Sequence, residues 1–259
     1  MSTALAVPRP ATPSLSPTAR PGLGRLTRVE LRKMADTRAG FWLMAAVVAL
    51  TAITVVARAL IGDAADHDLG SMMDVVLLPA AGLLPVAGIL LVTSEWSQRT
   101  GLITFTLVPV RSRVLAAKLL AGLVLSLAAL VVCLITIAAG VLLAAQGVDG
   151  AWSSSGAMAG QAAVFLTTSM VTGIAFGAAM LASAPAIVVY FTLPGIWTAL
   201  ASLPFLENVA PWADPALGPI TGEVLSATQW AQAGTALALW MLLPLLIGVW
   251  RITRREVTA

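Results

Sequence analysis

Few residues in this chain are of the types that carry out chemistry. There is one histidine, His67, and one cysteine, Cys133. The histidine stands beside Asp63, Asp66 and Asp68 in a short acidic segment, where the group could hold a cation only weakly. We interpret this segment as a solvated acidic loop, and we assign no redox or metal role to the cysteine, which lies alone in an apolar run.

Sequence motifs for catalysis are also missing. The chain has no Gly-x-x-x-x-Gly-Lys-Ser/Thr loop for binding nucleotide phosphates. It has no Gly-x-Ser-x-Gly elbow for a nucleophilic serine. Ionisable groups deep in an apolar run would favour a proton-driven carrier, and Arg58 is the one that we find near such a position. These observations disfavour an enzyme and an ion-coupled pump.

The composition predicts a membrane protein. Of 259 residues, 59% are hydrophobic and 10% are charged, whereas soluble domains carry about 25% charged residues. Six apolar stretches approach the roughly 20 residues that a spanning helix needs. They run from Phe41 to Ile61, Val75 to Thr93, Val114 to Ala145, Met158 to Ala182, Ala186 to Leu203 and Gln229 to Trp250. The predicted fold is therefore all-α and polytopic, against a soluble helical core as the alternative.

The domain organisation is simple. Residues 1–23 are rich in Pro, Ala, Ser and Thr and lack a signal-peptide core, so we expect a disordered cytoplasmic tail. Residues 24–259 form one membrane domain. We find no internal repeat, so the halves offer no sign of the inverted repeats of many carriers.

The orientation follows from where Lys and Arg fall relative to the six spans. With six spans and the N-terminus inside, nearly all basic residues fall on the cytoplasmic side: Arg9, Arg20, Arg25, Arg28, Arg32, Lys33, Arg38, Arg99, Arg111, Arg113, Lys118, Arg251, Arg254 and Arg255. The acidic residues of the outer segments are Asp63, Asp66, Asp68, Asp74, Asp149, Glu207, Asp214 and Glu223. This sorting predicts that both termini are cytoplasmic.

The segment before the first span predicts an amphipathic helix over Arg25 to Asp36. Thr27 and Glu30 have the spacing of a capping box. At 100° per residue, three arginines share one face, and four apolar residues spread over the opposite arc: Arg25, Arg28 and Arg32 against Leu26, Val29, Leu31 and Met34. Such a helix would lie along the inner interface of the membrane. An ordinary basic flank is the alternative.

The loop between spans two and three is the second informative segment. It runs from Thr93 to Arg113, continues to Lys118, and contains apolar residues that are costly to leave in water. Glu95, Arg99 and Arg111 place charges around them, and an apolar centre with a polar rim is typical of protein interfaces. The loop is therefore a candidate docking site for a partner protein, with re-entry into the membrane interface as the alternative.

Smaller patterns predict local structure. Ser71 with Asp74, and Ser226 with Gln229, resemble helix starts. Gly173 and Gly177 have Gly-x-x-x-Gly spacing, which favours close helix packing either within one subunit or across a dimer. A short turn at residues 183–185 joins the fourth and fifth spans.

The two cytoplasmic segments together carry a resemblance to a known family. The stretches "VELRKMADTRAGFWL" and "TSEWSQRTGLITFTLVPVRSRVLAAK" resemble permease subunits of ABC transporters of the type 2 exporter family, especially small six-span actinobacterial permeases. The matching residues are Glu30, Arg32, Lys33, Asp36, Thr37, Arg38, Thr93, Ser94, Glu95, Trp96, Arg99, Thr100, Pro109, Arg111 and Lys118. The motifs cover about a sixth of the chain, and the six-span topology covers nearly all of it.

The resemblance implies a non-catalytic subunit that works with other chains. It implies an elbow helix before span one, with Arg25, Arg28, Glu30, Arg32 and Lys33. It also implies a coupling segment that docks into a separate P-loop ATPase, which binds ATP and Mg; no cofactor is expected on this chain. The coupling residues would be Glu95, Trp96, Arg99, Thr100, Phe105, Pro109 and Arg111. The expected assembly has two permeases, as a homodimer, and two ATPases in the cytoplasmic membrane, without nucleic acid.

The resemblance further implies a transport path lined by spans two and five, and short re-entrant helices between residues 204 and 227. The spans offer apolar side chains and a few hydroxyls, including Thr167, Thr168, Ser169 and Thr192, which fits a hydrophobic or amphipathic cargo such as a drug, lipid or peptide. Three alternatives stay open: a sensory or immunity partner that does not transport, an intramembrane enzyme, and a channel.

Overall fold

The computed structural model describes residues 21–61, 67–97, 110–144, 150–153, 155–215 and 225–254. Within these ranges the chain is helical and contains no strand. In chain order the elements are α1 (Leu23–Asp36), α2 (Arg38–Ile61), α3 (Leu69–Ser97), α5 (Arg111–Ala144), α6 (Ser155–Met180), α7 (Ser183–Ala201), the 3₁₀ turns η2 (Pro204–Leu206) and η3 (Ala210–Ala213), α8 (Ala227–Leu237), the π-helical turn η4 (Ala238–Leu242) and α9 (Leu243–Arg254).

Among the described residues, six helices are long and apolar enough to cross a membrane. They are α2, α3, α5, α6, α7 and the continuous helix formed by α8, η4 and α9. The predicted all-α fold and its six spans are therefore confirmed as far as length and composition can decide. The largest change at a boundary is at α3, which begins at Leu69 rather than at residue 75.

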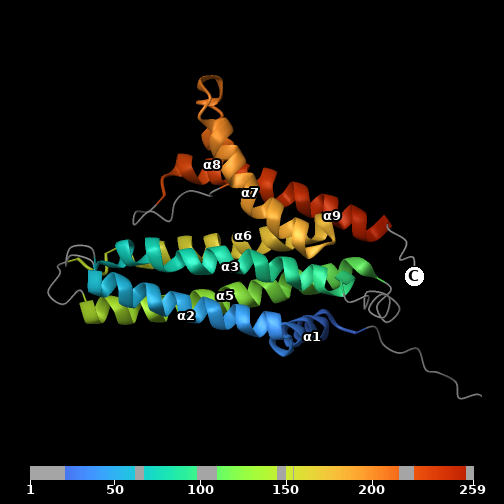
Figure 1. Ribbon diagram of the computed structural model, residues 1–259, viewed down its shortest axis with the longest axis horizontal. Helices are drawn as coiled ribbons and strands as arrows, with labels where there is room; N and C mark the ends of the chain where they lie inside the picture. The colour runs from blue at the N-terminus through green and yellow to red at the C-terminus, as the bar shows by residue number, and fades with distance from the viewer. Residues whose placement is uncertain are drawn as a thin grey trace, which may run out of the picture.

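Four of the spanning helices form a bundle along the long axis of the molecule (Figure 1): α2, α3, α5 and α6. The α8–α9 helix packs on α6, and α7 leaves the bundle at a steep angle (Figure 1). Helix α3 packs against α2, α5 and α6, and supplies most of the large side chains that are fully buried. The core thus lies around α3. By contrast, only 6% of the most apolar 18-residue stretch of α7 is buried inside the molecule.

Glycines allow α3 and α6 to cross closely. A Cβ at Gly173 of α6 would lie 2.6 Å from the Cα of Pro85 in α3, and one at Gly88 of α3 would lie 2.8 Å from the backbone nitrogen of Ile174. A Cβ at Gly177 would meet the backbone of Ile89 at 3.0 Å. The Gly-x-x-x-Gly pair therefore serves packing within one subunit, the first of the two alternatives left by its spacing.

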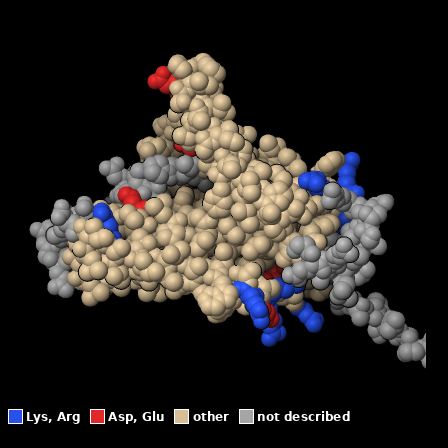
Figure 2. Space-filling view, in the orientation of Figure 1, with Lys and Arg blue, Asp and Glu red and all other residues tan. Residues whose placement is uncertain are grey.

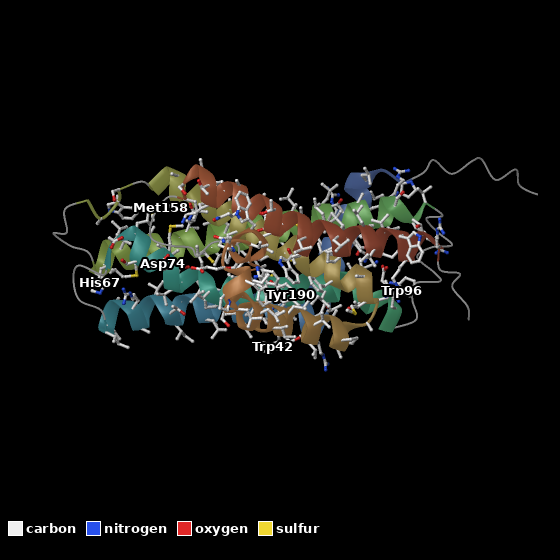
Figure 3. All side chains as sticks on the ribbon, turned by 90° about the horizontal axis from the view of Figure 1, so that it is seen from above. Trp42, His67, Asp74, Trp96, Met158 and Tyr190 are labelled. Atoms are coloured by element: carbon white, nitrogen blue, oxygen red, sulfur yellow. The ribbon has the colours of Figure 1, made fainter. Side chains whose placement is uncertain are left out.

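Both ends of the described chain lie at the same end of the bundle. Arg111, at the start of α5, donates a hydrogen bond to the carbonyl of Ile252 in α9 (2.7 Å), and Arg113 donates to Pro21, just before α1 (3.0 Å). Figure 3 shows Trp96 towards this end and His67 and Asp74 towards the other. Lys and Arg gather towards the α1 end (Figure 2), with Arg58 at the opposite end of α2.

Two predicted helix starts are wrong, and one is confirmed. Helix α1 begins at Leu23, so Thr27 lies inside it and its hydroxyl donates to the Leu23 carbonyl instead of capping. At α3 the cap is the carboxylate of Asp68, which accepts from the backbone of Gly70 (2.7 Å) and Ser71 (3.1 Å). The capping box of Ser226 and Gln229 is present at the start of α8.

Two interpretations of connecting segments also change. His67 is buried rather than solvated, and its ring nitrogens lie 3.2 Å from the Ala144 carbonyl and 3.3 Å from the Arg58 carbonyl, so it joins the ends of α5 and α2. The break between α6 and α7 falls at Leu181, whose φ of 55° is left-handed, and residues 183–185 already belong to α7.

Several predictions fall on residues outside the described ranges. These are the tail over residues 1–20, most of the acidic segment around Asp63 and Asp66, and the centre of the loop between spans two and three, residues 98–109. The predicted re-entrant region is described in part: η2 and η3 are short 3₁₀ turns, and residues 216–224 lie outside.

Candidate ion-pair site at the ends of α1, α3 and α5

Four charged side chains from three helices meet where the loop between α3 and α5 leaves the bundle. We call Glu30, Lys33, Glu95 and Lys118 the ion-pair ring. Glu30 and Lys33 are three residues apart and therefore share one face of α1. Glu95 lies in the last turns of α3, and Lys118 lies about two turns into α5.

The charges alternate around the ring. The Nζ of Lys33 lies 2.7 Å from Glu30 Oε1 and 2.6 Å from Glu95 Oε1. The Nζ of Lys118 lies 2.7 Å from Glu30 Oε2 and 3.4 Å from Glu95 Oε2. Each lysine thus contacts both carboxylates, and each carboxylate gives one oxygen to each lysine. The four formal charges sum to zero.

The ring is largely removed from water. The side chains of Glu30, Glu95 and Lys118 are 5%, 6% and 4% exposed, and that of Lys33 is 40% exposed. Lys118 also donates to the Leu91 carbonyl at 2.8 Å, so its three N–H groups each face an acceptor. Buried charges are costly unless they are paired and hydrogen-bonded, and here the pairing offsets that cost.

The pKa of Lys33 shows which effect dominates on α1. Burial lowers the pKa of this lysine, but hydrogen bonds and attraction from Glu30 and Glu95 raise it by more, so the pKa lies above its ordinary value. The ammonium is therefore charged throughout the physiological range. Its stabilising effect is fully present below the ordinary lysine pKa and is lost only as the pH rises through the higher folded value.

Further hydrogen bonds join the same end of the bundle to α7 and α9. The hydroxyls of Thr93 in α3 and Ser183 at the start of α7 lie 2.7 Å apart. Arg251 of α9 donates to the Ala179 carbonyl of α6, and Arg111 of α5 donates to α9. A displacement of the α3 and α5 ends would therefore act on α7 and α9 through these hydrogen bonds, and on α6 through α9.

The structure brings some of the predicted site residues together and leaves others apart. Glu30, Lys33 and Glu95 meet in the ring, Trp96 packs on the core beside it, and Arg111 binds α9. The predicted arginine face of α1 is exposed: Arg25, Arg28 and Arg32. The opposite face departs from the prediction, because Glu30 is buried there and Val29 is 45% exposed. Arg99, Thr100, Phe105 and Pro109 lie outside the described residues.

Lys118 is the ring member that the sequence analysis did not place among the site residues. It lies within α5, as the predicted span from Val114 to Ala145 implies and against the extension of the loop to Lys118. Glu95 lies within α3, so its predicted position in the loop is wrong. The signal was available, because Lys118 is a single ionisable residue followed by a long apolar run. Such residues usually have a partner inside the protein.

The ring contains no arrangement suited to catalysis. Among the described residues, no group of three or more His, Cys, Asp or Glu side chains could hold a metal ion. The carboxylates and ammonium groups are used by one another, so what the ring can do is hold three helix ends in fixed positions.

Comparison of the chain with protein-family models gave no match, and comparison with curated proteins gave no match either. The case for a function therefore depends on the residues and their geometry.

Proposed function

We propose that this chain is the transmembrane permease subunit of an ATP-driven exporter of the ABC type 2 class, working with a separate P-loop ATPase. The cargo would be hydrophobic or amphipathic, because the apolar helices offer hydroxyls but few charges. The proposal combines the resemblance of two sequence segments with the six apolar helices.

The observation that carries the proposal is the ion-pair ring. The two segments that resemble the family's elbow and coupling regions lie far apart in sequence, yet Lys33 of one lies 2.6 Å from Glu95 of the other. Glu95 and Arg111 stand on the two sides of residues 98–109, the segment that would meet the ATPase. A force on that segment would act directly on helices joined by the ring.

The distribution of charge supports the proposed orientation in the membrane. The described basic residues lie mostly at the end of the bundle that carries the ring, and the positive-inside rule favours a cytoplasmic position for that end. The chain would then be multi-pass in the cytoplasmic membrane with both termini inside, and the ring would face the compartment where ATP is available.

The exposed apolar surface of α7 supports the proposal that two copies of the chain assemble. Its outward face carries Val188, Phe191 and Ile196, each at least 50% exposed. Lipid would satisfy such a face, but a spanning helix that scarcely packs on its own subunit also favours a neighbour in the assembly. We propose a homodimer of permeases that meets two ATPases.

The proposed mechanism assigns the chemistry to the partner. ATP and Mg bound to the ATPase would supply the energy for movement. In this chain, Glu95 and Lys118 would transmit movement of residues 98–109 to α3 and α5, and Glu30 and Lys33 would make α1 follow. The cargo must bind with different affinity before and after the movement for transport to result.

The test is coexpression with the genes that flank the gene of this chain, followed by purification in nanodiscs and measurement of ATP hydrolysis. We expect the ATPase to copurify, and Arg99→Ala to lower the rate that the permease stimulates. Glu207→Gln, which changes an exposed charge just after the η2 turn, is the matched control. Equal copurification and equal ATP hydrolysis for Arg99→Ala and the unmodified chain would contradict the coupling role.

A further inference from the structure

The outward face of α1 carries a strongly positive patch. Four arginines are exposed on α1 and at the first residue of α2, and we call them the arginine patch: Arg25, Arg28, Arg32 and Arg38. Asp36 is the one exposed carboxylate of α1, and its oxygen lies 4.0 Å from Arg32. The side chain of Arg32 is nevertheless 83% exposed, so the patch keeps an excess of positive charge at the surface.

The opposite side of α1 is already covered by protein. Glu30 and Met34 are buried there, and Leu31 packs against the hydrophobic core. The helix contacts α5 and α2 on this side. An amphipathic helix that lies in a membrane surface buries its apolar face among the lipid chains. Because protein occupies that face in this chain, contact between α1 and a membrane must come from the outward face, which carries the arginine patch.

Two aromatic side chains mark the level of the membrane surface beside the patch. Phe41 and Trp42, in the first turns of α2, are 58% and 69% exposed, and their rings meet edge to face with centroids 5.7 Å apart. Tryptophan prefers the boundary between the lipid chains and the headgroups. Arg38 precedes Phe41 by three residues, so it lies at the depth of the headgroups, and α1 adjoins it through the extended residue Thr37.

The direction of the patch favours lipid as its occupant. Lys and Arg side chains at α1 project sideways from the bundle (Figure 2), across the long axis of the spans in Figure 1. Lipid surrounds a spanning bundle on its sides, whereas a partner in the water meets the end of the bundle. Residues 98–109, which the proposed function assigns to the ATPase, are flanked by Ser97 and Val110 at that end.

We propose that the arginine patch binds the headgroups of anionic phospholipids, with Phe41 and Trp42 against the beginning of their acyl chains. The guanidinium group donates in a fork that matches phosphate oxygens. A zwitterionic lipid carries the same phosphate beside a cation, so the patch selects lipids by net charge. Each basic residue near an anionic surface strengthens binding by about 5-fold.

The same helix connects this lipid surface to the ion-pair ring. Glu30 and Lys33 of α1 contact Lys118 and Glu95, whereas the arginine patch faces outward. Bound anionic lipid would therefore hold α1 on one face while the ring holds it on the other. An effect of the lipid on ATP-driven movement rests on the proposed function, whereas the lipid binding does not.

The test measures which lipid contacts Trp42 in nanodiscs that contain phosphatidylglycerol and phosphatidylcholine. Brominated acyl chains quench the tryptophans that they touch, and in two otherwise identical preparations only one of the two lipids is brominated. The signal of Trp42 is the difference between the unmodified chain and Trp42→Phe. We expect phosphatidylglycerol to be preferred about 5-fold at Trp42, the factor for one arginine at one headgroup. Trp230, 39% exposed at the start of the last span, should show equal quenching by both lipids.

Three variants test the role of the arginines. A triple variant, with Arg25, Arg28 and Arg32 all changed to Gln, should lower the preference at Trp42 to less than about 2-fold, since Arg38 stays. Lysine at the same three positions keeps the charge and should retain most of the preference. Arg254→Gln, which removes an exposed arginine from the end of α9, is the matched control and should leave the preference unchanged. The Tm of each variant in detergent shows that it is folded.

The outcomes separate the lipid surface from the proposed function. Equal quenching of Trp42 by both lipids in the unmodified chain would overturn the proposal. A preference that survives the triple Gln variant, or that Arg254→Gln removes to the same extent, would overturn its assignment to α1. If the preference is found and no ATPase copurifies, the lipid surface stands and the export function fails.

Discussion

Removal of Lys118 from the ion-pair ring is the most informative single change in this chain. Lys118→Met keeps a long apolar stem but removes the ammonium that contacts both carboxylates and the Leu91 carbonyl. Glu30 and Glu95 are both nearly fully buried, and Lys33 is then the one ammonium that the ring still offers them. Removing one partner of a buried pair costs about 3–5 kcal/mol, because the remaining charge is left uncompensated.

The double variant Lys118→Met with Glu30→Gln distinguishes charge balance from simple loss of contacts. It removes one positive and one negative charge, so Lys33 and Glu95 stay as a balanced pair at 2.6 Å. We expect the double variant to be more stable than the sum of the single variants by about 0.5–3 kcal/mol. Arg32→Met is the matched control, because Arg32 is 83% exposed and its nearest carboxylate oxygen, in Asp36, is 4.0 Å away.

The assay is unfolding in detergent, followed by intrinsic fluorescence against denaturant and by Tm. Lys118→Met should lower the Tm by on the order of 10 °C, the double variant should recover part of that loss, and Arg32→Met should match the unmodified chain. If Lys118→Met is as stable as Arg32→Met, or if the two ring substitutions are simply additive, the ring does not hold the three helix ends and the reasoning fails.

Three further predictions concern the bundle itself. Gly173→Leu should lower the free energy of unfolding by at least about 1–3 kcal/mol, because its Cβ would overlap the backbone of Pro85. Gly160→Leu on the same helix meets open space and should be tolerated. Equal Tm values for these two variants would refute the close crossing of α3 and α6. Asp68→Ala should cost about 0.5–2 kcal/mol by uncapping α3. Burial raises the pKa of Asp68, but hydrogen bonds from Ser71 and Gly70 lower it by more, so the pKa lies below its ordinary value. The stabilisation by the cap is therefore present above the ordinary aspartate pKa and is lost as the pH falls through the lower folded value. A difference in stability between Asp68→Ala and the unmodified chain that does not change with pH would contradict this. His67→Ala should loosen the ends of α2 and α5, seen as faster hydrogen exchange near Arg58 and Ala144 and unchanged exchange near Trp96.

Hydrophobicity alone predicted the spans, because twenty apolar residues in a row leave few alternatives. Polar contacts between helices were harder to predict. The sequence indicated that Glu30, Lys33 and Glu95 belong to two special segments, but their meeting depends on how α1 folds back on α3 and α5. Periodicity describes one helix at a time, so it assigned Glu30 to a cap and gave Lys118 no partner, whereas the packing buries both and pairs them.

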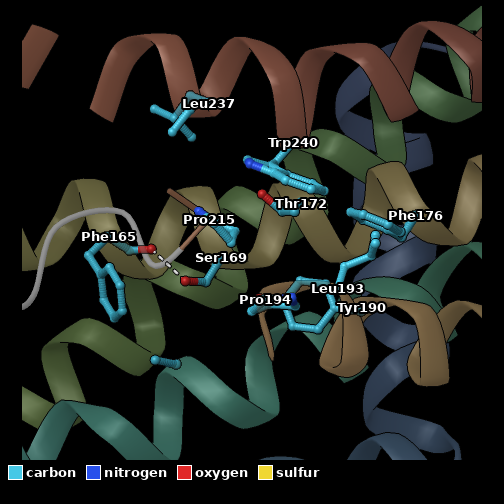
Figure 4. A pocket seen from close by; sticks show the side chains of 12 residues that line it. Phe165, Ser169, Thr172, Phe176, Tyr190, Leu193, Pro194, Pro215, Leu237 and Trp240 are labelled. Atoms are coloured by element: carbon cyan, nitrogen blue, oxygen red, sulfur yellow. Dashed lines mark hydrogen bonds between the residues drawn. The ribbon is translucent and has the colours of Figure 1, made fainter. Parts of the chain in front are cut away.

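Capping rules predicted a helix start correctly where the cap depends only on residues that are neighbours in the sequence. The box at Ser226 and Gln229 uses only neighbours in sequence, and it is present. At α3 the competing acceptor was Asp68, a stronger cap placed directly before the helix, and it displaced the predicted Ser71 start. A cavity among α6, α7 and η4 is lined by Tyr190 and Trp240, which are fifty positions apart in the sequence (Figure 4). No spacing rule in the sequence predicts this cavity or the π-helical turn that carries Trp240.

The central claim is that residues 98–109 meet a P-loop ATPase, and site-specific photocrosslinking tests it most directly. A photoreactive phenylalanine analogue replaces Phe105 in one variant and Phe205, exposed beyond the end of α7, in the other. After irradiation in cells that express the neighbouring genes, captured proteins are identified by mass spectrometry. We expect position 105 to capture a P-loop ATPase and position 205 not to capture one. Equal capture at both positions, or no ATPase at position 105, would contradict it.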